Sequence, residues 1–148
     1  MSIGLQTDPF PGPSTRYRPP IDGMRILYVD DELLLRRAVS RLLGSAGAVC
    51  VSTETHDQAV ELLACEPRID LAILDFHMPD GDVGRLVERL HGQRPDLTLV
   101  GTSGADRRSD FADRGVERFL AKPWSLDDLI RVAGWREVSA HRAAGAGS

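Results

Sequence analysis

Short apolar runs alternate along the chain with longer segments in which apolar residues recur every three or four positions. The short runs show no apolar–polar alternation, which is typical of strands that are buried on both faces of a sheet. Turn-forming residues flank each run. Five strands are therefore predicted, over residues 25–29, 48–52, 71–75, 97–101 and 118–121.

The segments with helical spacing follow these strands in turn. Two of them have a clear apolar side, formed in residues 32–44 by Leu35, Ala38, Val39 and Leu42, and in residues 83–90 by Val83, Leu86, Val87 and Leu90. A third helix is predicted behind Ser125, whose hydroxyl is a suitable N-cap, with the same spacing at Leu126, Leu129, Ile130 and Ala133. Weaker patterns predict helices over 57–65 and 107–113, the second anchored only by Phe111 and Ala112.

Repeated strand and helix units fold into a parallel sheet, because crossover connections between parallel strands are nearly always right-handed. The predicted fold class is α/β, a five-stranded parallel sheet with helices on both faces in a doubly wound (βα)5, flavodoxin-like arrangement. Residues 1–23 contain five prolines and little aliphatic periodicity, so we expect a disordered leader there. Residues 139–148 are rich in Gly and Ala and are expected to form a flexible tail.

Composition narrows the function classes. The chain has 148 residues, 42% hydrophobic and 27% charged, which suits one globular domain. With 18 basic against 22 acidic residues the net charge is -4, so direct binding to nucleic acid is not expected. The sequence shows no apolar run of about 20 residues and no signal-peptide pattern, so we expect a cytoplasmic protein without membrane insertion. Cys50 and Cys65 match no metal-ligand spacing and are expected to be buried free thiols.

Acidic residues stand at the ends of two predicted strands. Asp30 and Asp31 follow the first strand and Asp75 ends the third, and ligands of open parallel sheets bind at this carboxyl edge. Like charges held close together repel, so such a cluster is stable mainly with a cation among its oxygens, which points to Mg²⁺ or Mn²⁺. Two alternatives remain open: Asp30 and Asp31 as caps of the next helix, and Asp75 as a turn former before residues 78–81.

Hydroxyl and ammonium groups end the remaining strands at this edge. Thr102 and Ser103 follow the fourth strand and Lys122 follows the fifth, although a lone lysine there could also be a solvated surface charge. A hydroxyl and an ammonium group opposite a metal-bound carboxylate can hold the oxygens of a transferring phosphoryl group. In that interpretation Asp75 is the nucleophile.

Four sequence fragments in this order resemble a response regulator receiver domain of two-component signalling, of the single-domain chemotaxis-regulator kind. They are ILYVDDE at 26–32, LDFHMPDG at 74–81, GTSG at 101–104 and KPW at 122–124. The resemblance spans residues 24–138 and implies a stand-alone receiver that is not an enzyme beyond its own phosphorylation and dephosphorylation. It implies that a sensor histidine kinase or histidine phosphotransfer protein phosphorylates Asp75, and that a downstream partner protein then binds.

The resemblance also implies individual roles. Asp31 and Asp75 would bind Mg²⁺ directly, Asp30 would act through water, and the backbone carbonyl of His77 would complete the ligands. Lys122 would contact the phosphoryl group. A hydroxyl, Thr102 in preference to Ser103, would follow the phosphate inward and let the ring of Phe119 swing from exposed to buried. The imidazole of His77 would face solvent.

Three features depart from the family pattern. Val83 stands where glycine is common, the stretch 102–122 is short, and either Thr102 or Ser103 fits the hydroxyl position. Two other functions remain as alternatives. One is a metal-dependent phosphatase or hydrolase using the same acids, which lacks an evident substrate-binding insertion, and the other is a degenerate receiver that works without phosphate.

Overall fold

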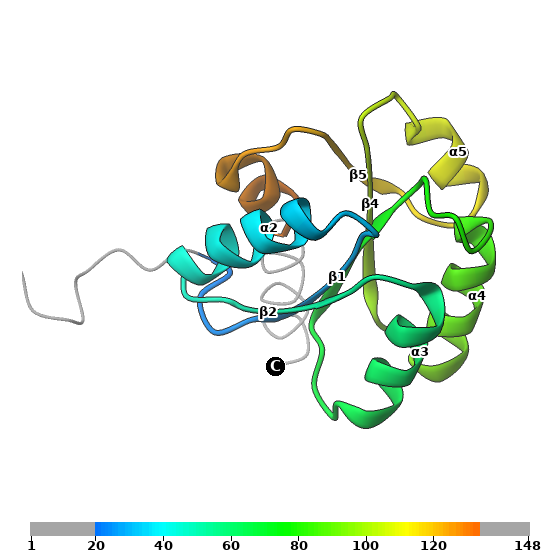
Figure 1. The fold of residues 1–148 in the computed structure, drawn as a ribbon, viewed down its shortest axis with the longest axis horizontal. Coiled ribbons are helices and arrows are strands. Elements are labelled where there is room, and N and C mark those ends of the chain that lie inside the picture. The colour runs from blue at the N-terminus through cyan, green and yellow to red at the C-terminus, as the bar shows by residue number, and fades with distance from the viewer. Residues whose placement is uncertain (1–19, 134–148) are drawn as a thin grey trace, which may run out of the picture.

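The computed structural model describes residues 20–133 and shows one parallel sheet with the strand order β2-β1-β3-β4-β5 (Figure 1). The strands are β1 (Arg25–Val29), β2 (Val49–Thr53), β3 (Leu71–Asp75), β4 (Thr98–Ser103) and β5 (Arg118–Ala121). The helices are α2 (Leu33–Ser45), α3 (His56–Cys65), α4 (Val83–Gln93), α5 (Arg108–Asp113) and a last helix over residues 126–133. The predicted fold class is confirmed. Residues 1–19 of the predicted leader, the predicted domain end at 138 and the predicted tail lie outside the described residues.

The helices form two layers around the sheet. Helix α2 and the helix over 126–133 cover one face, and α3, α4 and α5 cover the other (Figure 1). Successive side chains of a strand point to opposite faces, so each central strand contributes to both cores. In β1, Ile26 and Tyr28 join the core under α2, whereas Leu27 and Val29 join the core under α3 and α4.

Two strands, β2 and β4, extend beyond the ends that their runs of apolar residues predicted. Strand β2 covers Val49–Thr53 and β4 covers Thr98–Ser103, so both candidate hydroxyls belong to β4. The reason is pairing with neighbouring strands: Thr53 stands beside Val29 of β1, Thr102 stands between Asp75 of β3 and Leu120 of β5, and Ser103 stands beside Ala121 of β5. Backbone hydrogen bonding to a neighbouring strand extends β4 into polar residues that carry no apolar signal.

The buried side of α2 differs from the predicted one. Val39 and Leu43 are buried, while Leu35 and Leu42 are only half-buried and Ala38 is exposed. Compared with the prediction, the helix is rotated about its axis, so only one edge of the predicted apolar side packs on the sheet. The other margin opens into a cavity of about 400 Å³, lined by Tyr28, Leu35, Ala38, Val39, Leu42, Lys122, Pro123 and Trp124.

The last helix begins as predicted. The Ser125 hydroxyl accepts a hydrogen bond from the backbone N–H of Asp128 at 3.1 Å, and the Asp128 carboxylate accepts one from the Ser125 backbone N–H at 2.9 Å. This reciprocal pair satisfies two N–H groups that a helix start otherwise leaves unpaired. Ser125 is therefore confirmed as an N-cap.

The loop after β3 accommodates Val83 through a cap at Asp82. The Asp82 carboxylate accepts a hydrogen bond from the backbone N–H of Gly84 and pairs with Arg114 at 2.8 Å, while Val83 is buried beneath it. The Arg114 guanidinium and the Gly84 N–H lower the pKa of Asp82 to about 2. Asp82 thus starts α4 and also ties it to the residue that follows α5.

The two cysteines are free thiols, as expected from their spacing. Cys50 is half-buried, and burial raises the pKa of its thiol to about 11. Cys65 is exposed at the end of α3, so the prediction that both thiols are buried is wrong for Cys65.

Across residues 20–133, the structure contains no helix with the length and apolar character needed to cross a membrane.

Helix α5 is short and is held to the sheet by Phe111, which is fully buried. The Phe111 ring packs directly on Gly101 of β4: a methyl group added at Gly101 would lie 2.5 Å from the ring carbons. The weak apolar pattern of 107–113 is explained by this contact, because one large ring replaces the apolar stripe of a longer helix. The predicted helix is confirmed.

Replacing Gly101 with Ala is expected to destabilise the protein by about 1–3 kcal/mol, because the methyl group overlaps the Phe111 ring. Urea unfolding would measure the loss. Gly104→Ala is a matched control, since nothing lies within 4 Å of a methyl group there. Adding Phe111→Leu to Gly101→Ala should cost less than the sum of the two single changes. Equal stability of Gly101→Ala and the control would contradict this packing.

Candidate functional site

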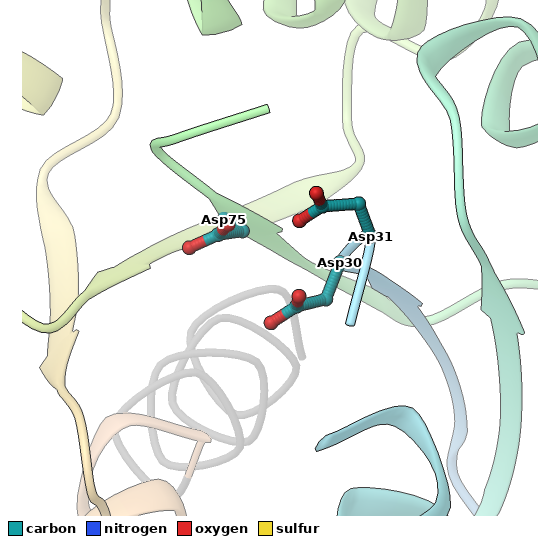
Figure 2. Close-up of side chains that lie close together, drawn as sticks. All are labelled: Asp30, Asp31 and Asp75. Atoms are coloured by element: carbon teal, nitrogen blue, oxygen red, sulfur yellow. The ribbon is translucent and has the colours of Figure 1, made fainter. Parts of the chain in front are cut away.

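Three aspartates meet at the carboxyl edge of the sheet, as the sequence predicted. Strands β1 and β3 are neighbours in register, and each delivers its acids to the same end of the sheet. Asp30 is fully buried, Asp75 is 5% exposed and Asp31 is exposed. One carboxylate oxygen from each residue lies within 4.8 Å of the others (Figure 2).

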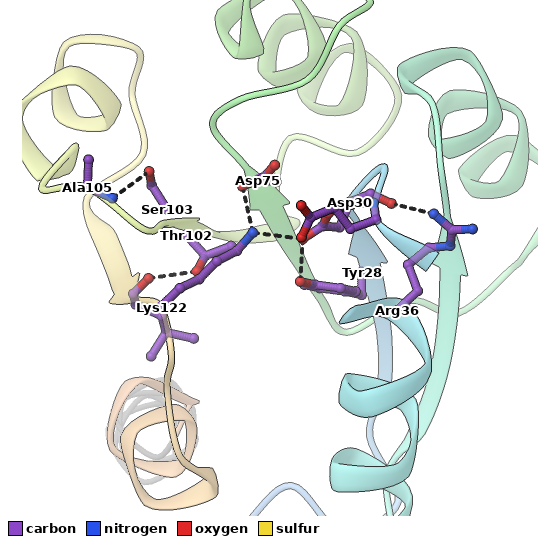
Figure 3. A network of polar contacts seen from close by, with 10 residues as sticks. Tyr28, Asp30, Arg36, Asp75, Thr102, Ser103, Ala105 and Lys122 are labelled. Carbon is purple, nitrogen blue, oxygen red and sulfur yellow. Dashed lines mark hydrogen bonds and ion pairs between the residues drawn. The ribbon is translucent and has the colours of Figure 1, made fainter. Parts of the chain in front are cut away.

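Lys122 joins this cluster from the end of β5. Its Nζ donates to Asp30 Oδ2 at 2.8 Å and to Asp75 Oδ1 at 3.0 Å (Figure 3). Burial alone would lower the pKa of Lys122, but hydrogen bonds to Asp30 and Asp75 hold that pKa above its usual value. The ammonium group is therefore charged and bridges two buried carboxylates, so the interpretation of Lys122 as a solvated surface charge is wrong.

The Asp75 carboxylate has a raised pKa. Burial is the main cause; the hydrogen bond and charge of Lys122 oppose it, and the charges of Asp30 and Asp31 add to it. The free acid cluster is thus only partly neutralised by one ammonium group. An additional cation among these oxygens would relieve the remaining repulsion.

The helix-cap alternative for the first two acids does not match the structure. The N-cap of α2 is Glu32, which makes no side-chain cap hydrogen bond. Asp30 Oδ1 instead accepts from the backbone N–H of Glu32 at 2.9 Å, before the helix begins, and the Asp30 carbonyl accepts from Arg36 at 2.9 Å. These contacts fix the position of Asp30 at the site.

The two candidate hydroxyls face opposite layers of the sheet. The buried Thr102 hydroxyl donates to the Leu120 carbonyl at 2.7 Å, and Leu120 belongs to the core under α2. The next residue, Ser103, points the other way along the strand, on the same face as Gly101 and the Phe111 ring. Its hydroxyl accepts from the Ala105 backbone N–H at 3.1 Å (Figure 3).

Phe119 lies in the layer of Ser103 rather than that of Thr102. Its ring is half-buried, with its centroid 5.9 Å from that of Phe111, and the Arg108 guanidinium lies 5.2 Å from its centroid. The prediction that Phe119 points away from Lys122 agrees with this position. Thr102 lies on the other face of the sheet, beside Asp75 in the register, and its expected link with Phe119 stays a prediction.

The His77 side chain is exposed and its ring meets the edge of Phe76, with centroids 5.0 Å apart. This agrees with the expectation that the imidazole faces solvent.

Two features of the site were missed in the sequence. Tyr28 donates from its hydroxyl to Asp30 Oδ2 at 2.6 Å, and Lys122 is the single lysine among 18 basic residues. A tyrosine within an aliphatic strand, two residues before an acid, could have indicated the first, because both side chains share one face of the strand. All the remaining basic residues are arginine, which could have indicated that position 122 needs the compact ammonium group of lysine.

The donor set fits a hard divalent cation. Carboxylate oxygens are the ligands that Mg²⁺ and Mn²⁺ take in proteins, and the exposed Asp31 leaves room for water ligands. The arrangement is an acid cluster typical of the Mg²⁺ site of receivers, with a lysine that can contact the oxygens of a phosphoryl group.

The fold and the site together define a signalling class: a doubly wound parallel sheet with an acidic cluster and a lysine at its carboxyl edge. The sequence model for the response regulator receiver domain matches residues 26–133, and the chain belongs to this family. It is a receiver domain of a two-component phosphorelay, which is not a classical enzyme, and this context implies a kinase partner.

Individual relatives agree with this assignment. The chain is similar to the sensor histidine kinase RcsC of Salmonella typhi, at 32% identity over 111 residues, which cover 73% of the chain and 12% of RcsC. The chain therefore spans only a small part of that relative. A CheY-like receiver from Methanospirillum hungatei matches with a TM-score of 0.72 at 22% identity, covering 82% of this chain and 99% of that one. TrrA of Thermotoga maritima, solved in complex with Mg²⁺ and BeF, matches with a TM-score of 0.64 at 24% identity, covering 72% and 92%.

Proposed function

We propose that Asp75 accepts a phosphoryl group from a sensor histidine kinase or a histidine phosphotransfer protein, and that this changes the surface offered to a downstream partner protein. The observation that carries the proposal is the position of Asp75, 5% exposed, beside two other acids and 3.0 Å from the Lys122 ammonium group. We further propose that the domain acts in the cytoplasm without direct contact to nucleic acid.

The metal ion is proposed to bind Asp31, Asp75 and the backbone carbonyl of His77, with Asp30 acting through water. Asp30 suits an indirect role because three donors already occupy its oxygens. Mg²⁺, or Mn²⁺ in its place, supplies positive charge to the oxygens of the transferring phosphoryl group.

The proposed transfer forms a bond between an Asp75 carboxylate oxygen and phosphorus while the phosphorus–nitrogen bond to the donor histidine breaks. The electron pair of the broken bond stays on the imidazole. Lys122 exchanges its contacts with Asp30 Oδ2 and Asp75 Oδ1 for a phosphoryl oxygen, a short movement because its Nζ already lies 3.0 Å from Asp75. Positioning and charge supply most of the acceleration in such a transfer.

We propose Thr102 as the hydroxyl that follows the phosphate, with Ser103 as the alternative. Thr102 stands beside Asp75 in the sheet register, so its side chain lies on the same face as the proposed phosphorylation site, and its hydroxyl would exchange the Leu120 carbonyl for a phosphoryl oxygen. Ser103 lies on the other face with Phe119, and its hydroxyl accepts from the N–H of Ala105.

The output surface is proposed to consist of α5, β5 and the helix over 126–133. Phe119 lies at its centre with its ring partly accessible, and burying a whole phenylalanine ring is worth roughly 1.5–3 kcal/mol. A gain of this size shifts a two-state population without locking it, so the switch is expected to be leaky. A pulldown with and without beryllofluoride would identify the partner and its dependence on the state.

The donor protein is proposed to approach over the start of α2. Leu33 and Leu34 are 50% and 77% exposed there, and the apolar cavity between α2 and Trp124 lies next to Lys122. Exposed leucines beside a phosphoryl-transfer site suit a protein partner, whose apolar side chains they would cover.

The hydrolase and degenerate-receiver alternatives are less well supported. The cavity next to Lys122 is lined almost wholly by apolar side chains, which is unsuited to a phosphoester substrate. A receiver that works without phosphate would not need the buried acids and the lysine bridge. Turnover of p-nitrophenyl phosphate at enzymatic rates would favour the hydrolase.

Incubation with labelled acetyl phosphate is expected to give acid-labile label on the protein only when Mg²⁺ or Mn²⁺ is present. The metal is needed because the acid cluster otherwise repels the incoming phosphoryl group. Asp31→Ala should lose the metal-dependent label, since it removes an exposed ligand while leaving the buried core intact. Label that is independent of metal, or unchanged in Asp31→Ala, would contradict the proposed ligand set.

A further inference from the structure

Tyr28 places a hydroxyl where the core of β1 otherwise needs only apolar surface. The residue is 1% exposed and its ring packs in the layer beneath α2. A buried hydroxyl is costly unless it is hydrogen-bonded, and this one donates to Asp30 Oδ2 at 2.6 Å (Figure 3). An aliphatic residue would fill the layer without contacting the site, so the hydroxyl calls for a role of its own.

The carboxylate of Asp30 is the point where this hydroxyl meets the site. Its Oδ2 accepts from Tyr28 and, at 2.8 Å, from Lys122, while its Oδ1 accepts from the Glu32 backbone N–H. Asp30 is fully buried, so bulk water does not screen these contacts. Tyr28 and Lys122 therefore share one oxygen atom.

Sharing weakens each of the two contacts. A hydroxyl donor draws negative charge from the oxygen that it binds, and the ammonium group on the same oxygen is then held less strongly. Burial, with the hydrogen bond to Asp30 adding to it, raises the pKa of Tyr28 well above its usual value, so the hydroxyl remains a donor.

We propose that Tyr28 is a positioning residue that weakens the hold of Asp30 on Lys122 and on the metal ion. The hydroxyl leaves Lys122 free to move from Asp30 toward a phosphoryl group on Asp75. This movement of Lys122 toward a phosphoryl group rests on the proposed function. A phosphoryl group carries a charge of about -1.5 to -2, and it competes with Asp30 for the same ammonium group.

Tyr28→Phe tests this proposal, because it removes the hydroxyl and keeps the ring. Without the hydroxyl, Asp30 should attract both cations more strongly. Calorimetric titration is expected to show Mg²⁺ binding roughly three- to tenfold tighter than in the wild type. The rate of phosphorylation by acetyl phosphate at saturating Mg²⁺ should fall by a similar factor, since Lys122 stays on Asp30. A site that is merely loosened would lose both affinity and rate.

A second measurement observes Lys122 directly. Lys122 is the only lysine of the chain, so protein labelled with ¹⁵N-lysine gives one side-chain ammonium signal in NMR. In Tyr28→Phe without phosphate, this signal should shift, and its protons should exchange with water more slowly than in the wild type. An unchanged signal together with unchanged Mg²⁺ affinity would overturn the proposal, as would weaker Mg²⁺ binding.

Ile26→Val is the matched control, because Ile26 is fully buried on the same face of β1 and does not contact Asp30. It should lower the melting temperature slightly and leave the Mg²⁺ affinity and the lysine signal unchanged; equal changes in both variants would overturn the proposal. If the wild type takes up no phosphate at all, the proposed function fails. The Mg²⁺ titration and the lysine signal then still decide whether Tyr28 weakens the hold of Asp30.

Discussion

Asp75→Asn is expected to reduce phosphate incorporation from acetyl phosphate, or from a cognate kinase, to background. The amide cannot form the acyl phosphate bond, and no other acid replaces it: Asp30 is engaged by three donors and Asp31 is the proposed metal ligand. The fold should persist, because the amide keeps the size of the side chain. Acid-labile label after gel separation and circular dichroism would measure the two properties.

Asp57→Asn is the matched control for this variant. Asp57 is an exposed acid of α3 that pairs with Arg89 outside the acid cluster, so the same chemical change should leave labelling intact. Undiminished labelling of Asp75→Asn would move the phosphorylation site elsewhere. Loss of the circular dichroism signal in Asp75→Asn alone would show that Asp75 supports the fold as well.

Lys122→Met is expected to have the largest effect on stability. It removes the ammonium group that bridges Asp30 and Asp75 and leaves buried carboxylates facing one another. Breaking a buried ion pair costs about 3–5 kcal/mol, and the partial exposure of Lys122 places the expected loss near the lower end of that range. Phosphorylation should slow by about 100-fold, the usual effect of losing one donor to a transition state. Urea unfolding without metal and labelling rates would measure both losses.

The effect of Lys122→Met should depend on pH in a defined direction. Burial raises the pKa of Asp75 above its usual 3.8, so the folded state binds a proton more readily than the unfolded state. The stability from this group is present below 3.8 and is lost as the pH rises through the folded pKa. Removing Lys122 raises that pKa further, so the gap in stability between variant and wild type should narrow as the pH falls from 7 toward 5. Mg²⁺ at pH 7 should also narrow it, whereas a constant gap would show that packing, not charge, causes the loss.

The sequence was sufficient to predict the sheet and the acid cluster. Strands β1, β3 and β5 have the predicted bounds, because their apolar runs end where the backbone leaves the sheet. Asp30, Asp31 and Asp75 could be placed together because parallel strands bring their carboxyl ends to one edge.

Other features depend on contacts that one strand does not encode. The pairing of β4 with β5 extends β4 beyond its apolar residues, and this decides which face of the sheet Thr102 and Ser103 each point to. The rotation of α2 follows from its contact with the sheet and with Trp124, where half-buried leucines line a cavity instead of the core. The role of Tyr28 appears only when Lys122, 94 positions further along the chain, reaches the same oxygen of Asp30.

Helix α5 packs on the sheet through a single aromatic ring, so it is expected to detach locally while the rest of the domain stays folded. Six residues and one buried side chain, Phe111, hold this helix to β4, whereas β3 is buried along its whole length between two strands. Hydrogen exchange is therefore expected to proceed in at least two steps, with the amides of α5 exchanging through local detachment and those of β3 only through global unfolding. The segment next to Phe119 would then be the least protected part of the described domain, and a partner that binds there would slow its exchange first.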